Sequence, residues 1–265
     1  MTPIALSIAG SDSSGGAGIQ ADLKTFSACG VYGATVITAL TAQNTRGVQA
    51  IHAVPPDFIE AQIESVCSDL HIGAIKIGML SNAAIIAAVS DALARHGARH
   101  VVLDPVMVAT SGDLLLKPDA VAALHTHLLP KARLITPNLP EAAQLLGVPV
   151  AHDERAMHIQ AERLLGFGPD AVLIKGGHGH GHESVDLLVS RDGVQRFSAP
   201  RIATRNTHGT GCTLSAAIAA GLAKGLALPD SVAMAKSYLT AALEKADTLS
   251  IGHGSGPVHH FHAIW

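Results

Sequence analysis

The chain has 265 residues, 48% of them hydrophobic and only 3% aromatic, which suits one globular domain with a core of Ala, Val, Ile and Leu side chains. Its 18 basic and 21 acidic residues give a formal net charge of −3 without a basic run, which argues against nucleic acid and membrane surfaces as partners. Three widely spaced cysteines indicate neither a disulfide framework nor a zinc site, and without a secretion leader or an apolar span we expect a cytoplasmic protein.

The first predicted unit is a strand, a loop and a helix. The apolar residues 4–9 predict a short buried strand, and residues 10–18 (GSDSSGGAG) form a glycine- and serine-rich loop. Residues 19–28 then predict a helix. A glycine-rich loop between a strand and a helix is typical of ligand-binding sites.

Strands and helices alternate along the rest of the chain. The predicted strands are residues 35–42, 75–77, 101–103, 134–135 and 172–174, and the helices between them are residues 57–70, 82–95, 118–128 and 140–146. A hairpin around Asp192-Gly193 and two helices, residues 213–224 and 230–245, follow. This order predicts one α/β domain over residues 1–265, with a mostly parallel sheet and helices on both faces. The carboxyl ends of parallel strands share one edge, where functional groups should gather.

A glycine turn, residues 206–212 (NTHGTGC), directly precedes an apolar, alanine-rich helix pattern. Gly209 and Gly211 flank Thr210, so that the backbone N–H groups of the turn can converge on an anion, above all phosphate, at a helix N-terminus. Cys212 would lie in the first helical turn, where the helix dipole favours the thiolate and lowers the thiol pKa. The alternative is a structural turn before a buried helix, with Cys212 an inert core residue.

Polar side chains follow three of the predicted strands. Asp104 could orient a divalent cation through its hard oxygen atoms, or cap the loop that follows it. Asn138 with Glu141 three residues later is typical of a capping box, and the same carboxylate would be placed to hold a hydrated magnesium ion. Lys175 could neutralise phosphate oxygens, or be an exposed lysine after a strand.

Taken in order, these motifs closely resemble those of the hydroxymethylpyrimidine/phosphomethylpyrimidine kinases of thiamine biosynthesis, a branch of the ribokinase-like superfamily. The motifs span nearly the whole chain and are residues 9–22 (AGSDSSGGAGIQAD), 41–45 (TAQNT), 77–79 (IGM), 104–107 (DPVM), 136–141 (TPNLPE), 175–178 (KGGH) and 206–213 (NTHGTGCT). The resemblance implies a ribokinase-like fold. It also implies ATP-dependent phosphorylation of 4-amino-5-hydroxymethyl-2-methylpyrimidine, and then of its monophosphate to the diphosphate.

The same resemblance implies roles for individual residues. Those implied for phosphoryl transfer are Gly209, Thr210, Gly211, Cys212 and Lys175. Those implied to bind the pyrimidine are Gln43 and Asp22 at its polar edge, and Gly10, Met79 and Val106 on its apolar side. Those implied to hold Mg²⁺ through water are Asp104 and Glu141. Cys212 takes the place of the aspartate base of most ribokinase-like sugar kinases, and whether it accepts a proton or only occupies that place is open.

The implied ligands are ATP, Mg²⁺ and a small pyrimidine, and the family resemblance favours a homo-oligomer, most simply a dimer. Two other functions stay open. A pyridoxal-type kinase of the same superfamily would act on a substrate that also carries a hydroxymethyl group on a heteroaromatic ring. A non-catalytic protein could sense the pyrimidine without phosphoryl transfer. Gln43, in its TAQNT setting, favours the aminopyrimidine, and retention of Cys212, Lys175 and Asp104 argues for catalysis.

Overall fold

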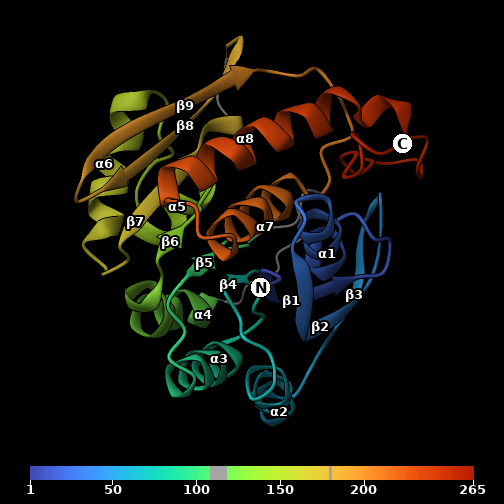
Figure 1. Ribbon diagram of the computed structural model, residues 1–265. Coiled ribbons are helices and arrows are strands. Elements are labelled where there is room, and N and C mark those ends of the chain that lie inside the picture. Colours follow the sequence, from blue (N-terminus) through green and yellow to red (C-terminus); the bar gives the residue numbers. More distant parts are fainter. Residues whose placement is uncertain (108–117, 179–180) are drawn as a thin grey trace.

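The computed structural model describes residues 1–107, 118–178 and 181–265, and a single mixed sheet runs through the described part (Figure 1). Its strands are β1 (Ile4–Asp12), β2 (Tyr32–Asn44), β3 (Gly47–Ala53), β4 (Ala74–Ile77), β5 (Val101–Leu103), β6 (Leu134–Ile135), β7 (Ala171–Lys175), β8 (Glu183–Ser190) and β9 (Gly193–Pro200). Their order is β3-β2-β1-β4-β5-β6-β7-β8-β9. The strands from β2 to β7 pair in parallel, whereas β3, β8 and β9 pair in antiparallel fashion at the two edges.

Helices cover both faces of the sheet. They are α1 (Gly18–Ala28), α2 (Pro56–Cys67), α3 (Ala83–Arg95), α4 (Pro118–Ala123), α5 (Leu139–Leu146), α6 (Glu154–Leu165), α7 (Thr210–Ala223) and α8 (Leu228–Glu244). Helices α1, α7 and α8 pack on one face, and α2 to α6 pack on the other (Figure 1). The predicted mostly parallel sheet with helices on both faces is therefore confirmed.

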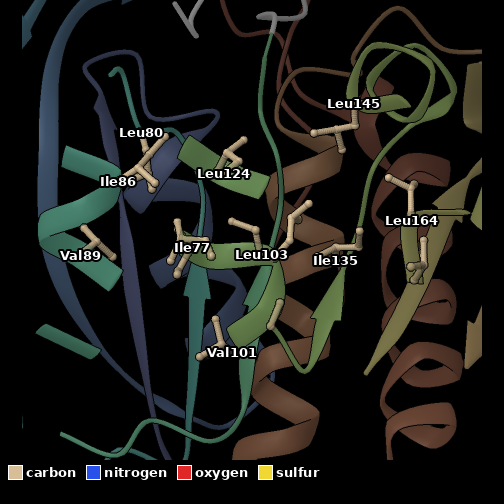
Figure 2. Packing of buried hydrophobic residues seen from close by; sticks show 14 of the residues in the cluster. Ile77, Leu80, Ile86, Val89, Val101, Leu103, Leu124, Ile135, Leu145 and Leu164 are labelled. Carbon is tan, nitrogen blue, oxygen red and sulfur yellow. The ribbon is translucent and has the colours of Figure 1, made fainter. Parts of the chain in front are cut away.

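Successive residues of the central strands enter two different cores, because side chains alternate across a strand. In β5, Val102 packs toward α7 and α8, while Val101 and Leu103 pack toward α3 and α4. Figure 2 shows Leu103 between Ile77 and Ile135 of the neighbouring strands. Each such buried aliphatic side chain stabilises the fold by about 1.5–3 kcal/mol. Double-sided burial explains why these strands are continuously apolar in sequence.

Helix α7 is the central helix of its layer, because it packs between α1 and α8 on the sheet. All of its residues from 213 to 222 are buried, which matches their alanine-rich, mostly apolar sequence. Gly221 lets α8 approach closely, since a β-carbon there would lie 2.7 Å from Ser231 Oγ. The first turn of α7 is thereby fixed at the carboxyl-terminal edge of the sheet.

Two elements were not among the predicted ones. Strand β3 is an edge strand whose mostly exposed residues show no apolar alternation. Helix α6 is polar on average, but Asp153 caps its N-terminus and Met157, Ala161 and Leu164 form its buried stripe. The predicted hairpin is confirmed as β8 and β9. None of the helices in the described residues is long and apolar enough to cross a membrane.

Candidate active site

A cavity of about 630 Å³ opens where the parallel strands end. The predicted site residues that line it are Gly10, Gln43, Met79, Asp104, Val106, Glu141, Lys175, Gly209, Thr210, Gly211 and Cys212. They come from the carboxyl ends of β1, β2 and β7, from the segments that follow β4 and β5, and from the start of α5 and α7. The topology thus brings together residues that lie far apart in the sequence.

The turn that precedes α7 has the geometry of an anion site. Gly209 has a φ of 80° and is the N-cap of α7, and a β-carbon there would collide with the carbonyl oxygen of Gly16. Because Gly211 and Cys212 lie in the first turn, their N–H groups have no acceptor within the helix. These groups and the positive end of the helix dipole can bind a phosphate in the cavity.

Cys212 is partly exposed in the cavity wall. Burial of the group raises the pKa of its thiol, although the charge of Lys76 acts in the opposite direction. The predicted lowering of this pKa by the helix N-terminus is therefore wrong. Loss of water around the sulfur, together with the nearby carboxylates of Asp22 and Asp104, outweighs the charge of Lys76 and keeps the pKa raised, so the thiol is the resting form at neutral pH.

A buried ion pair lies beside the anion turn. Lys175 Nζ is 2.7 Å from Asp104 Oδ1, and the hydroxyl of Thr136 donates to the same oxygen at 2.9 Å. A β-carbon on Gly211 would lie 3.3 Å from Lys175 Nζ, so the lysine charge borders the turn directly. Burial alone would raise the pKa of Asp104, but the charges of Lys175 and Lys76 hold it below its usual value. Asp104 is therefore ionised in the cavity wall.

Glu141 has the capping role that its sequence position suggested, and it also lines the cavity. Its carboxylate accepts from the backbone N–H of Asn138 at 2.8 Å and completes a capping box at the start of α5. The same side chain lines the cavity, where burial raises its pKa to about 7 even though Lys175 lowers it. Two hard carboxylates, Asp104 and Glu141, thus border a space large enough for phosphates, which is a donor set that suits hydrated Mg²⁺.

The opposite end of the cavity is mostly apolar. Met79 and Val106 line it together with Gly10, and a β-carbon on Gly10 would lie 3.2 Å from the sulfur of Met79. Gln43 offers its side-chain amide at this end, and its Oε1 accepts from the hydroxyl of Thr41 at 3.0 Å. A flat heteroaromatic ring with one polar edge fits such a lining.

Asp22 does not line the cavity, contrary to the role that the resemblance implied. It is fully buried beneath the cavity floor, where its Oδ2 accepts from Ser7 Oγ at 2.5 Å and from Lys76 Nζ at 2.9 Å. Helix α1 directs this side chain toward the sheet, so that it meets Lys76 of β4 and not the cavity. Direct contact between Asp22 and a pyrimidine is therefore excluded in this conformation. The sequence signal for this buried pair was Lys76, the one charged residue in the otherwise apolar strand β4.

Two further polar pairs were missed by the sequence reasoning. His208 pairs with Asp12, and the two side chains are 2.8 Å apart. Lys236 Nζ lies 2.7 Å from Asp186 Oδ2 at the end of the cavity formed by β8 and α8. His208 was within the glycine turn, yet its partner is 196 residues away in sequence, and no local pattern could have paired them.

Asp12 makes a testable contribution to stability. Burial alone would raise the pKa of Asp12, but hydrogen bonds from His208 and Ser14 lower it from 3.8 to about 2. Because the folded state binds the proton more weakly, ionised Asp12 stabilises the protein above pH 4, and this stabilisation, about 2 kcal/mol, is lost as the pH falls toward 2. In urea unfolding, the stability gap between the wild type and Asp12→Asn should shrink over this range. A gap that stays constant would contradict the lowered pKa, and Asp69→Asn, which removes an exposed carboxylate, serves as control.

Comparison with known proteins gives one consistent result. The sequence model of the phosphomethylpyrimidine kinase family matches residues 12–259. A hydroxymethylpyrimidine/phosphomethylpyrimidine kinase of Rhizobium meliloti is 62% identical to this chain, over 100% of the chain and 99% of that protein. The match therefore includes the glycine loops, the cavity and the C-terminal segment.

Solved structures of similar proteins share the fold. The phosphomethylpyrimidine kinase of Clostridium difficile is 45% identical, with a TM-score of 0.81 over 91% of this chain and 99% of that one. The pyridoxal kinase of Bacillus subtilis, solved as an ADP complex, is 36% identical, with a TM-score of 0.91 over 99% of both chains. These similarities confirm the expected ribokinase-like fold.

Proposed function

Because the chain belongs to the phosphomethylpyrimidine kinase family, we propose that it transfers the terminal phosphoryl group of ATP to the hydroxymethyl group of 4-amino-5-hydroxymethyl-2-methylpyrimidine. A second transfer, to the monophosphate, gives the diphosphate that thiamine biosynthesis uses. The observation that carries this function is the meeting of the glycine turn before α7, the cation of Lys175 and the thiol of Cys212 in one cavity.

Phosphoryl transfer needs fixed positive charge around the moving group. The N–H groups of Gly211 and Cys212 and the ammonium of Lys175 supply it from one side of the cavity, and they need no rearrangement when charge develops. The bond between the substrate oxygen and phosphorus forms as the bond from phosphorus to the ADP oxygen breaks. The proton of the substrate hydroxyl goes to the sulfur of Cys212, which acts in its thiolate form.

Asp104 and Glu141 would hold Mg²⁺ through water at the phosphate end of the cavity. When bound there, a magnesium ion would neutralise part of the phosphate charge. Lys175 pairs with Asp104 and borders Gly211, so it keeps the carboxylate ionised and holds a positive charge at the same place. The residues of β8 and α8 at the far end, with Lys236 and Asp186, are proposed to receive the nucleoside.

Gln43 is proposed to bind the polar edge of the pyrimidine through its amide. Gln43→Leu should weaken pyrimidine binding by about 1–3 kcal/mol, because a polar group of the bound ring loses its partner. Calorimetric titration of the pyrimidine checks this value. Gln49→Leu alters an exposed glutamine on the same hairpin that is not among the residues lining the cavity, and it should bind normally. Equal affinity of the wild type and Gln43→Leu for the pyrimidine would contradict a role of Gln43 in binding.

Pyridoxal is the second candidate substrate, because a pyridoxal kinase matches the fold with a TM-score of 0.91. The test is ADP release with each substrate, combined with mass spectrometry of the product. We expect a higher kcat/KM for the hydroxymethylpyrimidine and a diphosphate as its final product. A higher kcat/KM for pyridoxal would reverse the assignment, and tight pyrimidine binding without ADP release would make the protein a sensor.

A further inference from the structure

Two glycine-containing segments meet at one side of the cavity. The first is residues 12–18, from the end of β1 to the start of α1, and the second is residues 206–209, just before α7. Their backbones are in close contact, because a β-carbon on Gly209 would strike the carbonyl oxygen of Gly16, and one on Gly16 would strike the ring of His208. The anion turn therefore packs directly against the first loop, which determines its position.

Asp12 organises the first loop from within. Its Oδ2 accepts from the backbone N–H groups of Gly16 at 3.0 Å and Ala17 at 2.8 Å, and its Oδ1 accepts from the N–H of Ser14 at 2.8 Å. The side chain is only 2% exposed. His208 Nε2 lies 2.8 Å from the same Oδ2, so one buried carboxylate oxygen joins both segments.

The first loop also lines the cavity and contacts Gln43 at its pyrimidine end. Ala17 and Gly18 of this loop line the cavity together with Cys212. Ser13 exchanges two hydrogen bonds with the backbone of Gln43, since its hydroxyl donates to the carbonyl oxygen at 2.9 Å and accepts from the N–H at 3.0 Å. Any shift of this loop relative to the anion turn would therefore change the position of Gln43, and of a pyrimidine bound to it, with respect to the phosphate.

The C-terminal segment holds His208, the partner of Asp12, in place. The backbone N–H of His208 donates to the carbonyl oxygen of Gly256 at 3.0 Å. In the same segment, the N–H of Ser255 donates at 2.9 Å to the carbonyl oxygen of Thr45, two residues after Gln43. His208 is thus fixed from its backbone as well as through its ring.

From this network we propose that Asp12 and His208 are positioning residues, whose contact aligns the anion turn, which carries Cys212, with the loop that holds Gln43. The proposal rests on the proposed kinase function, because the alignment matters for phosphoryl transfer. Neither residue needs to react. Their effect should fall on turnover more than on the affinity for pyrimidine or ATP.

The test combines His208→Ala, His208→Gln, Asp12→Asn and the double variant His208→Ala with Asp12→Asn. We expect His208→Ala to lower kcat about 100-fold, as misplacement of reacting groups does, with small changes in KM for both substrates. His208→Gln, whose amide can still donate to Asp12, should recover part of kcat. Because the two residues act through one contact, the double variant should lose little more than the worse single variant.

A second readout does not depend on kinase activity. Alkylation of Cys212 by iodoacetamide, followed by mass spectrometry of its peptide, gives the pH midpoint of the thiol, and this midpoint should shift in His208→Ala as the first loop, which lines the cavity together with Cys212, moves. If the wild type releases no ADP, the kinase function fails while this shift still supports the alignment. Folded variants with wild-type kcat and an unshifted midpoint would overturn the proposal, as would additive losses in the double variant. If His208→Ala does not fold, His208→Gln and Asp12→Asn decide by the same measurements.

Discussion

Replacement of Cys212 by alanine is expected to lower kcat about 100-fold or more, while KM for the pyrimidine stays close to the wild-type value. The sulfur is proposed to take the hydroxyl proton as the oxygen attacks phosphorus, and alanine cannot accept it. The pyrimidine end of the cavity, formed by Gly10, Met79 and Val106, is untouched by the change. Steady-state kinetics with each substrate varied in turn separates the two parameters.

The matched control for this variant is Cys67→Ala. Cys67 is the last residue of α2 and packs against the core on the opposite face of the sheet from α7. Its replacement should leave kcat unchanged. Near-normal kcat in Cys212→Ala would show that Cys212 only packs in the cavity wall and does not take part in proton transfer. Because burial raises the pKa of the Cys212 thiol, wild-type kcat should also rise as the pH increases above neutral.

Replacement of Gly209 by alanine is expected to abolish activity and to reduce the free energy of unfolding by about 3 kcal/mol or more. Two costs add in this variant. Alanine would be forced to a φ of 80°, and its β-carbon would collide with the carbonyl oxygen of Gly16. Relief of the collision requires the anion turn to move away from the first glycine loop.

Gly225→Ala separates these two costs. Gly225 has a φ of 83°, but a β-carbon there would have no atom within 4 Å in the structure. Only the conformational cost, about 1 kcal/mol, should appear in its urea unfolding, and its kcat should be that of the wild type. If Gly209→Ala is no less stable than Gly225→Ala and retains activity, the close contact of the two glycine segments has no functional importance.

The sequence predicted the architecture well, because the parallel strands are buried on both faces and read as continuous apolar runs. Strand β3 escaped prediction since an exposed edge strand carries no such pattern. Helix α6 escaped because most of its residues are polar and only one narrow stripe is buried. In both cases the missing signal is burial, which comes from tertiary contacts.

Sequence could predict those site residues that lie at the end of a strand or in a glycine turn. Asp104, Lys175 and Gly209 meet in the cavity for that reason. Asp22 was placed wrongly, because sequence alone does not tell whether a helix directs a side chain into a cavity or beneath it. The contact of His208 with Asp12 joins residues that are 196 positions apart in sequence, so only the fold reveals it.

A crystal structure of the protein with the hydroxymethylpyrimidine and a non-hydrolysable ATP analogue tests phosphoryl transfer at the anion turn most directly. We expect the terminal phosphate within hydrogen-bond distance of the N–H groups of Gly211 and Cys212, and the hydroxymethyl oxygen between that phosphate and the Cys212 sulfur. A terminal phosphate bound away from the turn, or a hydroxymethyl group that points away from Cys212, would contradict this site of transfer.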